Sequence, residues 1–590
     1  MTTTTSEEKT PYHNEYGGDD EKQRRISLAD SAAGTDEELM AVRSQAWGKN
    51  GLIYMWLGIG LMWTIFELDN ATVYNYQNFA TSEFQQVSLL GALSTAGTIV
   101  SAVLKPPVAK VSDIIGRAET YCFAVALYIL SYVLCASSNE YNQYAASYII
   151  YCIGQTSMQI LNQLIVADIT TSRWRGLANG LVNLPFMIIP WIAAFIADSA
   201  LNTVGWRWGI GMFAIIMPVC SVVVIMPLLY FQRRMKQFGH STKAQATFIS
   251  FFSKIDIGGM TLLVAGFALV LLPLALAGTT PSRWDTAWVP ALIAVGGVCL
   301  IALGGYEWKI AANPIVPLHF FKNISLVLAW IMGLMDAFAF SATHTYMYTW
   351  AVVVHEFSVR DASFLTFTAG CMQVLTGLVA GALMYKTRRY KWLLVIGVAV
   401  RLLGYGVMLR LRGANNSVAE LFIVQLVQGF GSGIVLGIFL VVAQIVVPRS
   451  ELSQSTALEL LFIYMGNALG STAAGAIYTN SFAPRLRDYL PASSDELVNT
   501  ILNTFTEEPF ANGTPERTAI NAAYSDVMRY MTYAALGASV FGIILVWFLP
   551  NLQLSDKHNL AGEMNQIKAE SSKRADEGML RWWWRTGRLW

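Results

Sequence analysis

Long apolar stretches follow one another along most of this chain, and short polar segments separate them. A helix needs about 20 apolar residues to cross the hydrocarbon core of a bilayer, because each residue adds only about 1.5 Å of length. The pattern therefore predicts about fourteen membrane-spanning helices. Their approximate ranges are 51–77, 84–108, 119–137, 143–166, 177–199, 208–231, 256–278, 288–307, 325–351, 361–385, 391–410, 418–446, 453–478 and 530–549.

The composition supports a membrane protein. Of the 590 residues, 54% are hydrophobic and 13% are charged, whereas soluble domains contain about 25% charged residues. The formal net charge of +1 gives no support for a nucleic-acid partner, so we expect lipid around the chain and no nucleic acid. The first 46 residues are polar and lack the apolar core of a signal peptide, which predicts a disordered tail.

Lysine and arginine indicate the orientation. If the N-terminus is cytoplasmic, the inner loops carry sixteen Lys and Arg residues, and the short outer loops carry five. This excess of positive charge on the inner side predicts that both termini are cytoplasmic. One outer connection is expected to be long, at 480–528. It contains the sequon Asn512-Gly513-Thr514, so we expect glycosylation at Asn512.

Neither the cysteines nor the histidines indicate a metal site. All six cysteines fall in apolar stretches without a CxxC pair, and the six histidines have no ligand spacing. We therefore predict no disulfide framework and no bound metal.

A charged motif, Asp113-x-x-Gly116-Arg117, follows the second expected span. It resembles, in letters and position, the loop signature of the major facilitator superfamily. The resemblance implies a cytoplasmic latch in which Asp113 faces the positive N-terminal end of a helix near 451–453. It also implies that Arg117 pairs with Asp168. The alternative is an ordinary charged loop that follows the positive-inside rule.

Two further stretches narrow the family. LDNATVYNYQNFA (68–80) and VADITTSRWRGLANG (166–180), in a chain of fourteen spans, are similar to the fungal siderophore–iron transporters. Asp168 and Arg175, in the second stretch, join the expected latch. The resemblance implies an all-α polytopic fold with two six-helix bundles and an inserted helix pair. It also implies proton-coupled import of ferric siderophore chelates, with the iron carried only inside its chelate and no other cofactor.

The resemblance divides the chain into five expected parts. They are a cytoplasmic tail (1–46), an N-terminal bundle (47–235), a linker with the inserted pair (236–310), a C-terminal bundle (311–550) and a second cytoplasmic tail (551–590). We expect a functional monomer in the plasma membrane, which could also cycle through endosomal vesicles.

Acidic residues inside the spans are candidates for proton coupling, because charges in the membrane are costly and usually functional. They are Glu67, Asp69 and Asp336. On helical spacing the first two point about 200° apart, so only one of them can face a cavity. The family-like LDNATVYNY pattern favours Asp69 as that residue, with Glu67 packed against a neighbouring helix.

Aromatic rings and amide or hydroxyl donors suit the organic shell of a chelate. The candidate substrate-binding residues are Tyr74, Tyr76, Asn162, Gln163, His344, Tyr346, Trp350 and Gln428. The alternative is structural, because such amides often hold membrane helices together. On the same grounds Arg401 could pair structurally, and Lys105 is expected to extend its amine to the inner membrane surface.

The sequence is also compatible with two other functions. One is a fourteen-span efflux antiporter for drugs or secondary metabolites, and the other is a glutathione–proton exchanger. Antiporters carry a GxxxGPxxGG-like stretch in the fifth span, and the range 176–201 lacks its double-glycine ending. This difference favours the importer. We predict no enzymatic activity.

Overall fold

The computed structural model describes residues 51–73, 76–77, 79–81, 83–84, 90–237, 256–277, 286–311, 313–448, 451–490 and 514–554. Within these ranges the fold is helical, and twelve helices are long and apolar enough to cross a membrane. Two more segments have membrane length. One is divided into two shorter helices, α2 (Leu90–Val103) and α3 (Lys105–Ile115), and the other is the more polar α5 (Tyr141–Ile169). Twelve and two make the fourteen spans that the sequence predicts.

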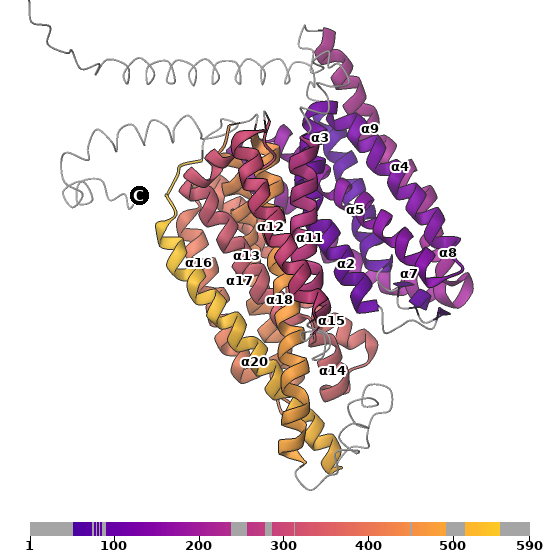
Figure 1. Ribbon diagram of the computed structural model, residues 1–590, viewed down its shortest axis with the longest axis vertical. Coiled ribbons are helices and arrows are strands. Elements are labelled where there is room, and N and C mark those ends of the chain that lie inside the picture. Colours follow the sequence, from indigo (N-terminus) through magenta and orange to yellow (C-terminus); the bar gives the residue numbers. More distant parts are fainter. Residues whose placement is uncertain are drawn as a thin grey trace, which may run out of the picture.

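The N-terminal half forms one bundle, shown in indigo and purple in Figure 1. It opens with the helix Gly51–Val73. Its remaining elements, besides α2, α3 and α5, are α4 (Arg117–Ala136), α6 (Ser172–Val182), η2 (Leu184–Met187), α7 (Ile189–Thr203), α8 (Gly205–Gly211) and α9 (Phe213–Gln237).

The C-terminal half forms a second bundle beside the first (Figure 1). Its elements are η4 (Leu318–Lys322), α13 (Ile324–His344), α14 (Met347–His355), α15 (Val359–Thr387), α16 (Lys391–Leu411), α17 (Val418–Ile445), α18 (Leu452–Tyr489), α20 (Pro515–Leu545) and η6 (Val546–Phe548).

Two spans are broken at prolines. Pro106 and Pro107 stand in the first turn of α3, where α2 ends and α3 begins. Pro185 and Pro190 open η2 and α7 in the fifth span. A proline in the first helical turn costs no intrahelical hydrogen bond, because the N–H groups there have no partner in the helix. The regular α-helix is therefore interrupted inside these two spans.

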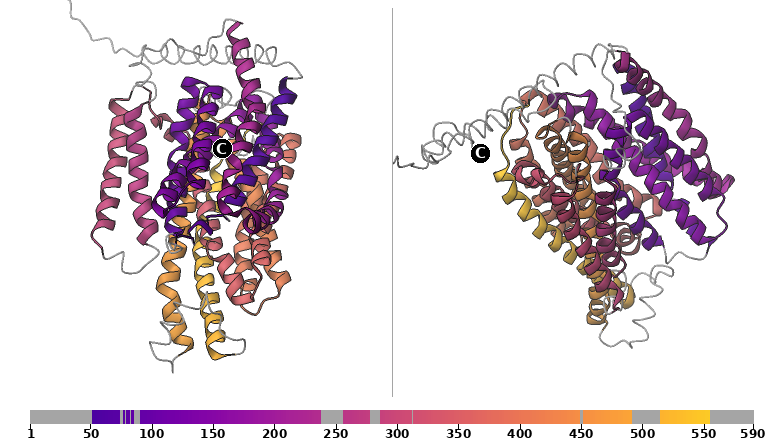
Figure 2. Two further views of the ribbon diagram at one scale, coloured as in Figure 1. Left: turned by 90° about the vertical axis from the view of Figure 1, so that its right-hand side faces the viewer. Right: turned by 45° about the horizontal axis from the view of Figure 1, so that its top comes forward.

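The inserted pair consists of α11 (Ile257–Ala277) and α12 (Trp288–Lys309). Figure 2 shows it as a separate hairpin along one side of the two bundles. Helix α11 packs against α2 and α18 in a cluster that includes Ile99, Leu271 and Ala468. The pair therefore covers the line along which the two halves meet.

The two halves approach most closely where α6 meets α15. A Cβ atom added to Gly381 would lie 2.5 Å from the carbonyl oxygen of Gly176, so only glycine permits this contact. Near the start of α18, an apolar cluster joins Ala109 and Leu164 of the first half to Leu452 and Leu460 of the second. We call the end of the molecule with this cluster and Asp113 the latch end.

The prediction of a long connection over 480–528 is wrong in its bounds, because helices extend into both ends of that range. Helix α18 continues to Tyr489 and α20 begins at Pro515, and Figure 1 shows both projecting at the end opposite the latch end. Leu486, Ile520 and Tyr524 are buried there in a common core. The hydropathy pattern ends where a helix leaves the lipid, whereas contacts between two helices can continue beyond that point.

Candidate functional site

The latch motif joins the two halves at the latch end. The guanidinium of Arg117 lies 2.8 Å from the carboxylate of Asp113 and 3.1 Å from that of Asp168, a residue near the end of α5. The hydroxyl of Ser453, on the first turn of α18, donates a hydrogen bond to Asp113 (2.7 Å) and accepts one from Arg117 (2.7 Å). Both contacts expected for the motif are present: Asp113 meets the first turn of α18 in the other half, and Arg117 pairs with Asp168 in its own half.

Gly116 and Arg175 support the same junction. Gly116 separates α3 from α4 with φ of 122° and ψ of 152°, a backbone region open essentially only to glycine. Arg175 is fully buried, and its guanidinium donates to the backbone carbonyl of Gln444 in α17 at 3.2 Å. The structure thus brings all five expected latch residues to one end of the molecule. Their action as a latch stays a prediction.

Asp69 lies inside the first bundle. It is completely buried, and the hydroxyls of Tyr151 and Tyr128 donate hydrogen bonds to its Oδ2 at 2.9 and 3.2 Å. The ring of Tyr132 stacks on Tyr128 beside them. The expectation that Asp69 lines a cavity mouth is therefore wrong, because its helix turns that face toward α4 and α5. Its role in proton coupling stays a prediction.

Glu67 lies on a different face of the first helix from Asp69. Its side chain is 9% exposed, which agrees with the expected packing against neighbouring helices. One turn further, the exposed Asn70 accepts a hydrogen bond from Gln155 of α5 at 3.1 Å. The role of Glu67 in proton coupling stays a prediction.

A buried lysine connects both halves within the membrane. Lys105 is completely buried at the proline break, and its Nζ donates to Oε1 of Gln159 at 2.7 Å. The hydroxyl of Tyr464 donates to the same oxygen at 3.0 Å, and Nζ lies 3.9 Å from the centre of the Tyr464 ring. We call these three residues the bridge. Lys105 does not extend to the membrane surface as expected, because the break turns it inward.

The sequence reasoning missed Lys105 as a functional candidate, although a signal was present. A lysine in an apolar run, followed directly by Pro106 and Pro107, marks a break in a membrane helix. At such breaks polar groups are tolerated where protein surrounds them. Asp113, at the latch end, lies eight residues beyond Lys105 along α3. At about 1.5 Å per residue, the bridge therefore lies about 12 Å from Asp113 along this helix.

The candidate tyrosines of the first half do not form a binding face. Tyr76 is completely buried, and a Cβ atom on Gly209 of α8 would lie 2.6 Å from its ring. It therefore packs within the first bundle, which contradicts its expected contact with substrate. Tyr74 lies outside the residues that the structure describes, as does Asn512.

The two candidate amides of α5 differ in position. Asn162 is completely buried and accepts a hydrogen bond from Tyr121 of α4 at 3.0 Å, so it joins two helices rather than lining a cavity. Gln163 is half-buried, and its Oε1 has no hydrogen-bond partner among the described residues. Nδ2 of Asn162 also lacks a hydrogen-bond partner among the described residues, so the two differ in burial, and binding by Gln163 stays a prediction.

Asp336 pairs with Arg401 inside the second bundle. The guanidinium of Arg401 donates to the two carboxylate oxygens at 2.7 and 3.1 Å, and both side chains are almost completely buried. Arg401 also donates to the side chain of Gln428 at 3.2 Å. Arg401 therefore forms the structural ion pair that was one of the alternatives expected for it. Gln428 is completely buried beside this pair and is not open to substrate, against expectation.

The other aromatic candidates of the second half also have internal partners. His344 is 2.9 Å from Gln425 of α17, and Tyr346 stacks on Tyr478 with ring centres 4.6 Å apart. Trp350 is completely buried in the core of this half. These contacts place Trp350 away from any surface that a substrate could reach, against expectation. Binding by His344 and Tyr346 stays a prediction.

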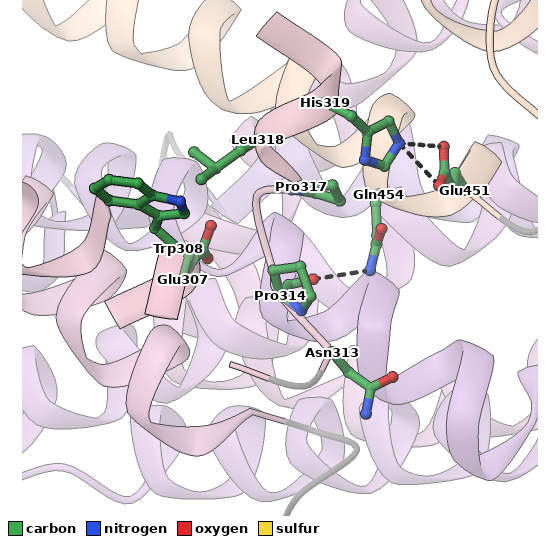
Figure 3. Close-up of a pocket in the computed structure, with 9 residues that line it drawn as sticks. All are labelled: Glu307, Trp308, Asn313, Pro314, Pro317, Leu318, His319, Glu451 and Gln454. Atoms are coloured by element: carbon green, nitrogen blue, oxygen red, sulfur yellow. Dashed lines mark hydrogen bonds and ion pairs between the residues drawn. The ribbon is translucent and has the colours of Figure 1, made fainter. Parts of the chain in front are cut away.

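A cavity of about 450 Å³ opens at the latch end (Figure 3). Its walls come from the end of α12, the segment before η4 and the start of α18. His319 is 2.9 Å from Glu451, and Gln454 donates to the carbonyl of Pro314 at 3.4 Å. The cavity therefore lies where the inserted pair meets the second half. Among the described residues, no group of three or more His, Cys, Asp or Glu residues could hold a metal ion.

Comparison with known proteins gives consistent matches. The sequence profile of the Major Facilitator Superfamily matches residues 51–354. Siderophore iron transporter 1 of Schizosaccharomyces pombe is 32% identical over 82% of this chain and 79% of its own length. Siderophore iron transporter mirC of Emericella nidulans is 30% identical over 90% of each chain. The structure of the human organic anion transporter MFSD10 aligns with a TM-score of 0.52 at 12% identity, over 84% of this chain and 98% of that chain.

Proposed function

Because the chain belongs to the major facilitator superfamily, and within it to the fungal siderophore iron transporters, we propose that it imports ferric siderophore chelates with protons across the plasma membrane. It is a multi-pass membrane transporter and not an enzyme. The latch end is then cytoplasmic, as are both termini, and the sequon at Asn512 lies outside. The iron is cargo held by its organic chelate, and the chain works as a monomer without a cofactor.

The observation that carries the choice of substrate is the bridge of Lys105, Gln159 and Tyr464. A ferric chelate presents oxygen atoms and amides, because the metal's own coordination shell is already filled. Lys105 has no carboxylate partner among the described residues. Its ammonium group, the amide of Gln159 and the phenol ring of Tyr464 offer donors and an aromatic face to such a surface. The polar face with Glu67 and Asn70 adds further contacts.

The position of the bridge supports movement of the two halves as a basis for transport. Lys105 and Gln159 belong to the first half, and Tyr464 belongs to the second. A ligand that displaces Tyr464 from Gln159 and from Lys105 replaces contacts between the halves. Substrate binding and the relative position of the halves are then linked, as alternating access requires.

Proton coupling is assigned to the intramembrane acids Glu67, Asp69 and Asp336. The three acids are not equivalent, because their side chains have different surroundings. Asp69 accepts from two tyrosines, Asp336 is held by Arg401, and Glu67 is 9% exposed on a different face of the first helix from Asp69.

Expression in a yeast without its own siderophore carriers tests the function. Radioactive iron is supplied as ferric hydroxamate, and accumulation in the cells is measured with and without a protonophore. We expect uptake that the protonophore abolishes. Absence of uptake, combined with resistance to exported toxins, would show that the chain is an efflux carrier.

The variant Lys105→Met tests the bridge. It preserves most of the side-chain volume and removes hydrogen bonds of a charged group, each worth about 1.5–3 kcal/mol. We expect uptake at low chelate concentration to fall about 10- to 100-fold at equal surface abundance. The matched control is Lys322→Met, which changes an exposed lysine of η4. Equal loss in both variants would exclude a specific role for Lys105.

A further inference from the structure

Glu459, on α18, is a carboxyl group without a visible partner. Its side chain is completely buried, and neither Oε1 nor Oε2 has a hydrogen-bond partner among the described residues. The three acids named above differ from it. Asp69 accepts from tyrosines, Asp336 is paired with Arg401, and Glu67 retains 9% exposure.

A glycine makes room for this carboxyl group. A Cβ atom added to Gly333 of α13 would lie 2.8 Å from Oε1 of Glu459. Further along the same contact, Gly466 of α18 approaches the carbonyl oxygen of Leu334 to the point where a Cβ would lie 2.2 Å from it. Helices α13 and α18 thus pack backbone to backbone, with the carboxyl group enclosed between them.

The charged and titratable groups on the neighbouring elements are engaged elsewhere. On α13, Asp336 is held by Arg401. On α3 and α5, Lys105 donates to Gln159, and Asp168 pairs with Arg117. On α18 itself, the hydroxyl of Tyr464 donates to Gln159. Lys110 of α3 contacts Asn313 and Asp256, and on α20 Arg517 pairs with Glu356 and Arg529 with Asp526. No hydrogen bond or ion pair joins Glu459 to a cation among the described residues.

Burial of an ionised carboxylate without a partner costs several kcal/mol, whereas a neutral carboxyl group is far less costly. The packed state therefore favours the protonated form of Glu459. Ser453, which holds the latch through Asp113 and Arg117, precedes Glu459 by six residues on the same helix. That separation is about 9 Å along α18, so movement of the latch end changes the surroundings of the carboxyl group.

We propose that Glu459 binds a proton of the transport cycle and that its protonation is linked to closure of the latch end. This inference rests on the proposed function and adds a fourth residue to the three acids named there. In the closed state the carboxyl group holds the proton in its niche beside Gly333. When the latch end opens, water reaches the carboxyl group, which transfers its proton to water and becomes a carboxylate.

The linkage is reciprocal. A proton stabilises closure of the latch end, and loss of the proton stabilises opening. With the latch end cytoplasmic, a proton taken up from outside in the closed state is released inside after opening. The variant Glu459→Gln is always neutral, so its latch end closes without a proton.

Transport by Glu459→Gln in membrane vesicles gives the first test. We expect labelled ferric hydroxamate to equilibrate across the membrane but no longer to accumulate against its gradient. Proton entry on addition of chelate should disappear, and the rate of equilibration should no longer depend on pH. The matched control is Glu140→Gln, which changes an exposed glutamate and should behave as the unchanged protein.

Two results would overturn the proposal. One is accumulation and proton entry by Glu459→Gln at the level of the unchanged protein. The other is loss of equilibration as well as accumulation, since the side chain would then serve packing rather than the proton.

A second test does not depend on the substrate, so it separates this inference from the proposed function. A cysteine placed at Ala109, which is buried between the halves at the latch end, reports opening through its reaction with a thiol reagent. The background lacks the six native cysteines. Because the reacting species is the thiolate, labelling rises with pH in any variant. The rise should be steeper in the protein with Glu459 than in Glu459→Gln, where ionisation of the thiol alone contributes. Equal pH dependence in both would overturn the linkage, even if the chain carries no siderophore.

Discussion

Replacement of Ser453 by alanine should open the latch end. The hydroxyl of Ser453 on α18 contacts both latch charges, at 2.7 Å from Asp113 and 2.7 Å from Arg117. A hydrogen bond to a charged group is worth about 1.5–3 kcal/mol. Since the side chains of Asp113 and Arg117 retain 30% and 19% exposure and still pair with each other, water replaces part of the loss.

We therefore take the value of one such bond, about 1.5–3 kcal/mol, as the total loss for the closed state. This shifts the balance between the closed and open latch about 10- to 100-fold. The thiol-labelling rate of a cysteine at Ala109 should rise by that factor. The matched control is Ser471→Ala on the same helix, whose hydroxyl contacts only the carbonyl of Ala468. An unchanged labelling rate in Ser453→Ala would refute this account of the latch.

Two further predictions concern the buried acids. Asp69→Asn should abolish proton-driven uptake while surface abundance stays normal, because the asparagine still accepts from Tyr128 and Tyr151 but carries no proton. Full uptake would remove Asp69 from the coupling residues. Arg401→Met should destabilise the second bundle by about 3–5 kcal/mol, since it leaves the Asp336 carboxylate buried without its partner. Thermal unfolding in detergent measures this loss of stability. Adding Asp336→Asn to Arg401→Met should restore part of it. An unchanged unfolding midpoint in Arg401→Met would show that the ion pair contributes little.

The latch was largely predictable from the sequence. Asp113, Gly116 and Arg117 follow one another at a short spacing, and Asp168 ends a neighbouring span. The motif determines local geometry at a helix end, so its partners lie where the family resemblance implies. The bundle as a whole was predictable for a similar reason. Each apolar stretch of membrane length must satisfy its own backbone hydrogen bonds, and a helix is the way to do so.

The candidate binding residues were much less predictable. Periodicity gives the angle between Glu67 and Asp69 on their helix, but it does not give the rotation of that helix in the bundle. The rotation depends on packing, here on the tyrosines of α4 and α5 that surround Asp69. The same limit explains why Trp350 and Gln428 are buried in their own half.

By itself, the sequence determined that this chain is a membrane protein of about fourteen helices with a charged latch, because hydropathy and short motifs are local properties. Only the tertiary structure decided which polar groups meet. Lys105 pairs with Gln159 and lies over Tyr464, 359 residues further along the chain (464 less 105). Glu459 meets a glycine instead of a cation. Such distant contacts depend on how whole helices pack, and no local pattern in the sequence contains that information.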